Sequence, residues 1–209
     1  MTSSLKSQNG VALYALMAAN LVVFCAVLKG RALFAGDWIG AIHNLSQVLP
    51  AGVGLILTGI LNAQLSPNAK SRIVFMRWRN PLPGCDAFTR YAHIDPRINV
   101  AALEKQYGPL PAEPRVQNAT WYKLYKTIES EPAVVQAHRS FLFARDYCCI
   151  ALMVLLVLGS IALVQMASIK IALLYVGCLI FQLLLAGQAA RNHGRRFVST
   201  VLAIKSSEH

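Results

Sequence analysis

The stretch Cys148–Gln188 decides the fold, and it reads CCIALMVLLVLGSIALVQMASIKIALLYVGCLIFQLLLAGQ. Lys170 is its only charged residue. A membrane helix needs about 20 apolar residues to cross about 30 Å of hydrocarbon, so the stretch is long enough for two spans, 148–166 and 169–188. Because only Ala167 and Ser168 separate these spans, they must form a tight antiparallel hairpin. The stretch therefore predicts an all-α membrane protein.

Two further apolar runs lie near the start of the chain, at residues 11–28 and 48–65. Asn20 alone interrupts the first run, and Pro50 falls in the first turn of the second, where proline is tolerated. The first run is longer than a signal sequence and no small-residue cleavage site follows it, so we expect it to be retained. We therefore predict four transmembrane helices in two hairpins, 1–65 and 148–190.

The basic residues are distributed unevenly around these runs. Of the 20 Lys and Arg, 12 lie between the second and third runs, four lie after the fourth, and the two opposite loops hold only Lys29, Arg31 and Lys170. Lys and Arg accumulate in the cytoplasmic loops of membrane proteins. We therefore expect both termini, the segment 66–147 and the basic tail 191–209 to be cytoplasmic. The inverted orientation would place most of the positive charge outside.

The composition agrees with a membrane protein. Of the 209 residues, 56% are hydrophobic and 14% are charged, whereas soluble domains carry about 25% charged residues. The net charge of +11 does not by itself indicate nucleic-acid binding. The segment 66–147 mixes seven acidic residues with its 12 basic ones, so we do not expect direct contact with nucleic acid. Asn44–Leu45–Ser46 matches a glycosylation acceptor that would face outward.

The segment 66–147 is long enough for a compact domain, and its turn residues divide it into helices. Asn99, or the pair Asp95–Pro96, can start a helix over 100–107, and Gly108 ends it. A second helix is predicted after the next proline-rich connection. Its apolar positions fall on one helical stripe of Trp121, Leu124, Tyr125 and Ile128.

The last helix of this segment is predicted to enter the third span. Ser130 is a good N-cap, and Pro132 suits the first turn that follows it. No breaker lies between Pro132 and Met166, so the helix continues for about 35 residues, or about 50 Å. We therefore predict a mostly helical cytoplasmic insertion between the second and third transmembrane helices.

The tail also has helical spacing. In Arg195–Lys205, the apolar residues Phe197, Val198, Val201 and Leu202 lie on one face. We expect this segment either to lie along the inner membrane surface or to pack on the cytoplasmic domain.

The stretch Ser71–Asn80, SRIVFMRWRN, combines basic and aromatic residues directly after the second span. Each basic residue near an anionic leaflet contributes about 1 kcal/mol to membrane attraction, and tryptophan favours the head-group boundary. We predict a membrane-surface site that contacts anionic lipid. Its residues are Lys70, Arg72, Phe75, Arg77, Trp78, Arg79, Arg195 and Arg196.

A search for catalytic chemistry finds little. The chain has no phosphate-binding glycine loop, nucleophile elbow or metal-binding His-Glu-x-x-His pattern, and its five cysteines have no zinc spacing. We expect neither a metal nor another cofactor. His93 and Asp95 can form an acid–base pair near the membrane, or simply cap a turn.

Apart from cysteine, tyrosine and Lys170 at the start of the fourth span, the spans contain no ionisable residue, which disfavours a proton-coupled pump. A small-residue face in the second span permits close helix approach, and two amides can bond between helices or line a narrow pore. The predicted residues for self-association or a pore are Asn20, Gly52, Gly54, Thr58 and Gln182.

Aromatic and basic residues alternate in Trp121–Lys126. They suit a surface for a protein partner, although Trp121 and Tyr125 also suit a domain core. The predicted partner-binding residues are Trp121, Tyr122, Lys123, Tyr125 and Lys126.

Several short motifs follow one another in the insertion: LPGCDAF from Leu82, DPR from Asp95, GPLP from Gly108 and WYKLY from Trp121, then Ala137–His138 and Arg145–Asp146. This pattern resembles a family of bacterial inner-membrane proteins with four transmembrane helices. The resemblance implies a bacterial inner-membrane setting, and it carries no activity over to this chain.

We therefore expect a non-enzymatic, homo-oligomeric inner-membrane protein. It would act as a sensor, an anchor or a pore-forming effector through a cytoplasmic domain that binds a protein partner, in a bacterial stress or phage-defence module. Two alternatives stay open at this point. One is a lipid-modifying enzyme at the membrane interface, and the other is a channel or transporter for small solutes.

Overall fold

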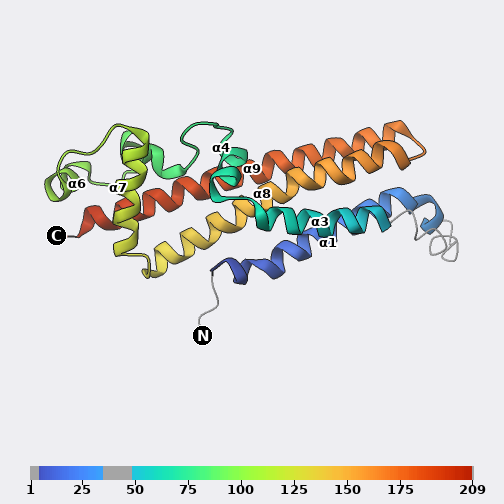
Figure 1. Cartoon of the computed structure of the whole chain (residues 1–209), viewed down its shortest axis with the longest axis horizontal. Helices are drawn as coiled ribbons and strands as arrows, with labels where there is room; N and C mark the ends of the chain where they lie inside the picture. The colour runs from blue at the N-terminus through green and yellow to red at the C-terminus, as the bar shows by residue number, and fades with distance from the viewer. Residues whose placement is uncertain (1–4, 35–48, 209) are drawn as a thin grey trace. The chain divides into compact units, whose positions relative to one another are not determined.

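The computed structural model describes residues 5–34 and 49–208, with side chains for 9–28 and 49–208, and this part of the chain is all helical. The first helices are α1 (Leu5–Phe34), α3 (Leu49–Gln64) and α4 (Pro67–Phe75). A 3₁₀ turn η2 (Pro83–Asp86), a π-helical turn η3 (Ala87–Tyr91) and α5 (Ala92–Ile94) follow. Four longer helices complete the described chain (Figure 1): α6 (Val100–Tyr107), α7 (Pro114–Thr127), α8 (Pro132–Gln165) and α9 (Ile169–Ser207).

The chain forms two compact units. We call residues Met1–Leu65 with Asp146–Ala186 the apolar unit, and residues Ser66–Arg145 with Gly187–His209 the aromatic unit. The boundary falls within α8 and within α9, so each of these helices supplies residues to both units. The predicted glycosylation triplet Asn44–Ser46 and the first residue of the predicted second span lie outside the described residues.

Three helices of the described chain are long and apolar enough to cross a membrane: the segment Asn9–Leu28 of α1, and α8 and α9. The predicted four spans are therefore supported only in part. α3 has 16 residues, or about 24 Å at 1.5 Å per residue, which is short of the hydrocarbon thickness. A fourth span exists only if α3 and α4, bent by 108°, together count as one.

The bend between α3 and α4 follows from the local sequence. Pro67 lacks the N–H that would continue α3, and it disfavours helical geometry in the residue before it. Ser66 is extended, with ψ 155°, and its hydroxyl accepts a hydrogen bond from Ala69 N that starts α4. The change of direction is therefore fixed by a helix stop and a new N-cap.

The predicted helices of the insertion are found. α6 covers 100–107, capped by Asn99, whose side chain accepts from Ala102 N. Gly108 follows it with φ 81°, a value that favours glycine. α8 runs without interruption for 34 residues, as predicted. Ser130 is not its N-cap, because Ser130 lies in the turn of residues 128–131 and the helix begins at Pro132.

The tail does not form a separate surface helix. α9 continues from the predicted fourth span to Ser207, 39 residues in all, because Phe197, Val198, Val201 and Leu202 are buried in the core of the aromatic unit. Gly194 permits this packing. A Cβ at that position would lie 2.9 Å from Phe75 Cζ and 3.1 Å from Phe141 Cε2.

The core of the aromatic unit is a cluster of rings on α7, α8 and α9. The Trp121 and Phe197 rings meet edge to face with centroids 5.2 Å apart, and Tyr125 stacks on Trp121 at 5.8 Å. Gln117 is buried beside them. Its Oε1 accepts from Phe88 N (2.9 Å) and Thr89 N (3.1 Å), and its Nε2 donates to Ala112 O. One amide thus holds η3 against α7.

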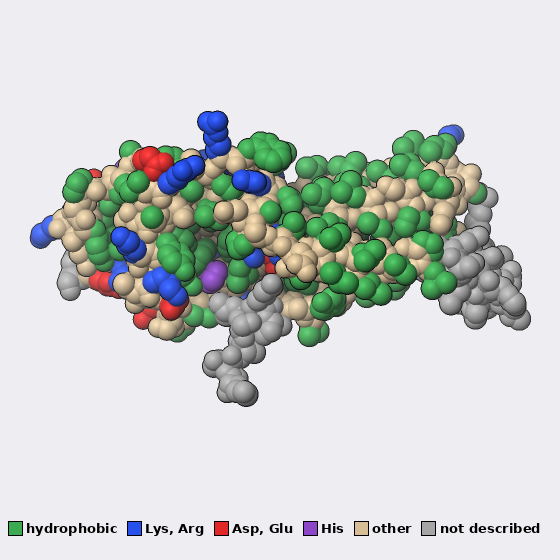
Figure 2. Space-filling view, in the orientation of Figure 1, with side chains coloured by type: hydrophobic (Ala, Val, Ile, Leu, Met, Phe, Trp, Pro, Cys, Tyr) green, Lys and Arg blue, Asp and Glu red, His purple; other side chains and the backbone are tan. Residues whose placement is uncertain are grey.

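The apolar unit differs on its exterior. Its core consists mainly of aliphatic side chains around Phe24 and Leu158. Of the 27 exposed large hydrophobic side chains in the described chain, 21 belong to this unit, and Figure 2 shows its visible face covered by hydrophobic atoms. Such a surface is unstable in water and stable in a bilayer. A multi-pass membrane protein accounts for this unit.

Candidate functional site: an exposed Trp-Arg loop and a groove between helices

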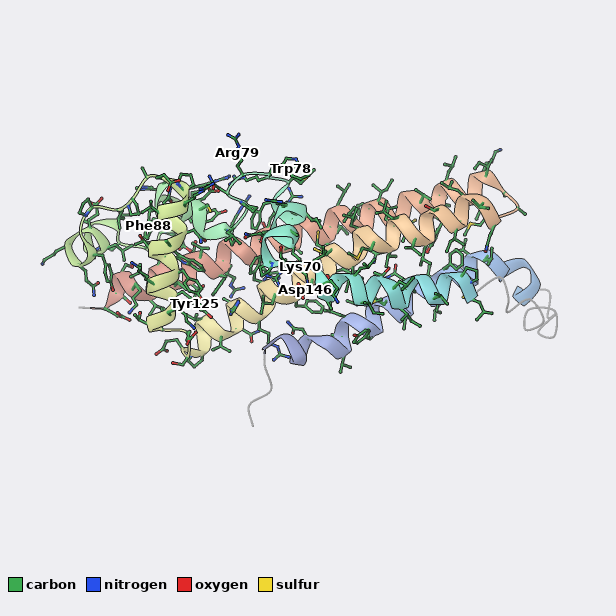
Figure 3. All side chains as sticks on the ribbon, viewed as in Figure 1. Lys70, Trp78, Arg79, Phe88, Tyr125 and Asp146 are labelled. Atoms are coloured by element: carbon green, nitrogen blue, oxygen red, sulfur yellow. The ribbon has the colours of Figure 1, made fainter. Side chains whose placement is uncertain are left out.

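The loop Met76–Asn80, between α4 and η2, presents the most exposed large hydrophobic side chains of the aromatic unit. Met76 is 77% exposed and Trp78 is 83% exposed. Figure 3 shows Trp78 and Arg79 pointing away from the ribbon. Met76 and Asn80 have φ of 53° and 50°, which is uncommon for residues other than glycine. A strained backbone of this kind persists only where its surroundings hold it.

Two contacts hold the loop. Phe75, directly before it, packs against the aromatic core. Inside the loop, Arg77 Nη1 donates to Asp86 Oδ2 over 2.6 Å, and this hydrogen bond raises the pKa of Arg77. The Arg77 side chain keeps 41% exposure, so the ion pair anchors the loop at the surface and leaves Trp78 and Arg79 outside.

The other predicted membrane-surface residues divide into two groups. Arg72, Arg195 and Arg196 are exposed. Lys70 is 2% exposed, which corrects its predicted place on the surface, since a buried ammonium group cannot reach a lipid head group. Its position on α4 turns it inward together with Ser71 and Val74. The exposed candidates therefore lie on α4, in the loop that follows it, or on α9.

The predicted partner surface on α7 also divides. Trp121 and Tyr125 are 5% and 9% exposed and belong to the core, so the core alternative describes them and a partner cannot contact their rings. The helical period leaves Tyr122, Lys123 and Lys126 on the outer face. Tyr122 is 51% exposed, and Lys126 pairs with Glu129. The exposed face therefore consists of one tyrosine and two lysines.

The small residues of α3 make contacts within the chain. A Cβ on Gly54 would lie 2.5 Å from Val157 Cγ1 on α8, whereas a Cβ on Gly52 would meet nothing within 4 Å. The Thr58 hydroxyl is buried and donates to Gly54 O over 2.9 Å. Gly54 and Thr58 therefore serve packing inside the unit, and Gly52, about 200° from Gly54 around α3, is an open position.

The two amides predicted for self-association or a pore have different partners. Asn20 Nδ2 donates to Leu16 O of its own helix over 2.8 Å. Gln182 Nε2 on α9 donates to the Tyr147 hydroxyl on α8 over 2.6 Å, which is a bond between helices. Both amides line a groove of about 510 Å³ between α1, α8 and α9. A larger groove of about 730 Å³, almost entirely apolar, lies between α1 and α3.

The proposed acid–base pair does not form. The Asp95 carboxylate accepts from Arg97 Nε (2.9 Å), Arg97 Nη2 (2.7 Å) and Arg97 N (3.1 Å). The hydrogen bond from Arg97 lowers the pKa of Asp95. A carboxylate held in this way orders the turn before α6 and is a poor general base. His93 is exposed on α5, so the two residues named for the lipid-modifying alternative do not form an acid–base pair.

Sequence reasoning missed the environment of His138. Its ring stacks on Phe197 with centroids 4.6 Å apart, and its Nδ1 lies 3.2 Å from the Tyr125 hydroxyl. Burial lowers the pKa of His138, with Arg145 acting in the same direction. The Ala137–His138 motif drew attention to this histidine, but it did not indicate that Phe197 and Tyr125 contact its ring. Nor do the described residues contain a group of three His, Cys, Asp or Glu side chains able to hold a metal ion.

No protein-family model, curated protein or solved structure matches this chain.

Proposed function

We propose that this chain is a non-enzymatic, multi-pass protein of the bacterial inner membrane. Its aromatic unit would be cytoplasmic, held on the anionic inner leaflet by the loop Met76–Asn80, and would bind a protein partner. The observation that carries the proposal is the exposed Trp78 between Arg77 and Arg79 on a loop fixed by the Arg77–Asp86 ion pair.

The chemistry of this loop favours a lipid surface. Tryptophan places its apolar ring and its N–H at the head-group level of a bilayer. Arg79 and the exposed Arg72 would each add about 1 kcal/mol of attraction to an anionic leaflet. The same residues in water would leave an 83% exposed indole with no compensating contact. A membrane surface therefore satisfies both the ring and the charges.

The outer face of α7 supports the partner-binding part of the proposal. Tyr122 supplies a rigid aromatic anchor of the type enriched at interfaces, and Lys123 and Lys126 would favour an acidic partner. Since α8 and α9 each supply residues to both units, binding at the aromatic unit has continuous helices through which to act on the apolar unit. Such a coupling suits an anchor or a sensor. We also propose that copies of the chain associate through the open Gly52 position of α3.

Tryptophan quenching in nanodiscs tests the membrane contact. The full-length protein, carrying Trp38→Phe so that Trp78 and Trp121 are its two tryptophans, is placed in nanodiscs that contain phosphatidylglycerol with brominated acyl chains. We expect bromine to quench a large share of the fluorescence, and Trp78→Phe to remove that share. Trp121, 5% exposed in the core, is the internal reference. Equal quenching with and without Trp78 would contradict the proposal.

A matched variant separates lipid contact from folding. Arg79→Gln removes one exposed charge beside Trp78 and keeps the Arg77–Asp86 ion pair of the loop. We expect it to reduce quenching most in nanodiscs with anionic lipid and little in zwitterionic ones. If the quenching of both the parent protein and Arg79→Gln is the same in anionic and zwitterionic nanodiscs, the loop contacts something other than an anionic leaflet.

A further inference from the structure

The groove between α1, α8 and α9 is a place where the apolar unit can hold a ligand. It encloses about 510 Å³, within the range of about 300–1,000 Å³ that small-molecule sites occupy. On α9 its lining runs from Ile171 to Gln182, which corresponds to about 16 Å along the helix. A groove of this length admits a chain-like molecule lying parallel to the helices.

One tyrosine of the groove wall has a hydroxyl group without a partner. Tyr175 lines the groove and is 5% exposed, and its buried hydroxyl has no hydrogen-bond partner among the described residues. The ring is fixed by Phe24, with centroids 5.9 Å apart. A buried phenol normally finds a partner, because leaving it unpaired is destabilising. The wall of the groove therefore holds a hydrogen-bond donor that has no partner within the described chain.

The other polar groups of the groove define the kind of molecule. Asn20, Tyr147 and Gln182 line it together with Tyr175, and all four side chains are uncharged. Among the side chains that the structure describes, none that lines the groove is Asp, Glu, Lys, Arg or His. A phosphate or ammonium head group would enter this groove without a counter-charge, at a high desolvation cost. An uncharged group that accepts a hydrogen bond would enter without that cost.

We propose that this groove binds an uncharged lipid whose carbonyl oxygen accepts a hydrogen bond from the Tyr175 hydroxyl. The aliphatic part of the lipid lies along Val23 and Val27 of α1 and Ile171 of α9, which line the same groove. The Gln182–Tyr147 bond (2.6 Å) keeps α8 and α9 together beside it. The proposal needs the apolar unit to be in a membrane, and goes beyond the proposed function in naming a ligand class.

Photolabelling of the full-length protein in nanodiscs tests the site. The probe is a diacylglycerol with a photoreactive acyl chain, and labelled peptides are located by mass spectrometry. We expect labelling of α1 and α9 peptides that line the groove, saturable with probe. Unlabelled diacylglycerol or an isoprenoid benzoquinone, which share the carbonyl group, should compete, and the stronger competitor identifies the source of the carbonyl. Phosphatidylglycerol of the same chain length should not compete.

Two tyrosine variants make the test specific. Tyr175→Phe keeps the ring on Phe24 and removes the hydroxyl, and we expect about five- to ten-fold weaker labelling, the value of one hydrogen bond. Tyr14→Phe, in the other groove, should label like the wild type. Because Tyr175→Phe removes an unpaired polar atom, its melting temperature without added lipid should be equal or higher, which shows that it folds.

Three results would overturn the proposal. Tyr175→Phe could label as strongly as the wild type, phosphatidylglycerol could compete as well as the uncharged lipids, or labelling could fail to saturate. Insertion into nanodiscs is measured in the same samples, so a loss of the groove site is distinguished from a failure of the proposed membrane location.

Discussion

The two units differ in where their hydrophobic side chains lie: the aromatic unit buries most of its large ones, and the apolar unit exposes many of them. In the aromatic unit, large rings such as Phe88 and Phe197 are buried, and only six large hydrophobic side chains are exposed. In the apolar unit, exposed and buried positions are equally hydrophobic, as in α9, where Leu179 is buried and Ile180 and Phe181 are exposed. The solvent around each unit accounts for this difference.

The comparison shows where specificity comes from in each unit. In the aromatic unit, apolar burial is combined with a buried amide, Gln117, whose hydrogen bonds fix one local backbone arrangement. In the apolar unit, lipid removes the hydrophobic drive between helices, so close fit and a few hydrogen bonds must specify the packing. The fit of Gly54 against Val157 and the Gln182–Tyr147 bond have this role.

The largest effect is expected from the buried amide of the aromatic unit. Gln117→Leu keeps the volume and leaves Phe88 N and Thr89 N without their acceptor. An unsatisfied buried group costs about 1–3 kcal/mol. Since Phe88 N is buried and Thr89 N is partly buried, we expect a loss of about 3 kcal/mol in the free energy of unfolding. Hydrogen exchange in the full-length protein should quicken in η3 and α7 and stay unchanged in the spans of the apolar unit.

Gln106→Leu is the control for this prediction. Gln106 is exposed on α6, so its replacement should change stability by no more than about 0.5 kcal/mol. If both leucine variants behave alike, the Gln117 hydrogen bonds do not specify the aromatic unit, and hydrophobic burial alone sustains it.

The next effect concerns the fit of helices in the apolar unit. Gly54→Ala places a methyl group 2.5 Å from Val157 Cγ1. Because a valine in a helix strongly prefers one rotamer, the Val157 side chain cannot easily rotate away from this methyl group. We expect a loss of about 1–3 kcal/mol, measured by unfolding in mixed micelles of increasing dodecyl sulfate.

Gly52→Ala is the matched control, two residues away in the same helix. Its Cβ meets nothing within 4 Å, so the folded protomer should be unchanged or stabilised by up to about 1 kcal/mol through helix propensity. If Gly52→Ala instead lowers the stability of an oligomer, Gly52 lies between copies, as the proposed self-association requires. If Gly54→Ala and Gly52→Ala lower the free energy of unfolding of a monomer equally, the close fit of Gly54 against Val157 does not specify the packing.

Sequence patterns predicted most of the helices and less of their ends. The stripe of Trp121, Leu124, Tyr125 and Ile128 predicted α7 and its buried face, because period 3.6 is a local property. The same stripe could not show that Trp121 and Tyr125 are withdrawn from a partner, since that depends on Phe197 from the distant tail. Hydropathy predicted that the second span ends at residue 65, but it did not predict the change of direction at Ser66–Pro67, where α4 begins.

The candidate sites were less predictable than the helices. The sequence indicated the basic and aromatic loop at Arg77–Arg79. Lys70 is buried, however, because it lies two residues before Arg72 on α4, and two residues turn a helix by about 200°, to the opposite face. The role of Gln117 depends on residues 28 and 29 positions earlier, and no local pattern reports such a pair. The hydroxyl of Tyr175 became a candidate only when its surroundings were known.

A smaller effect is expected from pH, and only in the aromatic unit. The pKa of His138 is lowered by burial, so between that pKa and about 6.5 the unfolded state binds more protons than the folded state. Stability should therefore fall as pH decreases below about 6.5, by at most about 1.4 kcal/mol per pH unit. Hydrogen exchange at pH 7.5 and 5.5, corrected for intrinsic rates, measures this in α7 peptides.

His138→Phe keeps a ring on Phe197 and removes the titration, so its stability should be flat over this interval. His93→Gln is the control, since His93 is exposed on α5, and it should retain the wild-type dependence. The apolar helices carry no His, Asp, Glu, Lys or Arg in 11–28, 49–64 and 148–166, so their exchange should not follow the same curve. A shared curve would show that the two units do not respond to protons separately.

The smallest effect belongs to the Asp95–Arg97 pair. The hydrogen bond from Arg97 lowers the pKa of Asp95, so the pair stabilises the folded state above the unfolded pKa of about 3.9, and this contribution is lost as pH falls through the lower folded pKa. Because the Arg97 side chain is 58% exposed, solvent screening keeps the contribution below about 1 kcal/mol. Asp95→Asn should remove it at pH 7, with faster exchange confined to residues 95–99 and the start of α6, and 0.5 M salt should weaken the wild type toward the variant. If exchange in the apolar helices changes as well, this surface turn influences both units, and the contrast between a proton-sensitive and a proton-insensitive unit is lost.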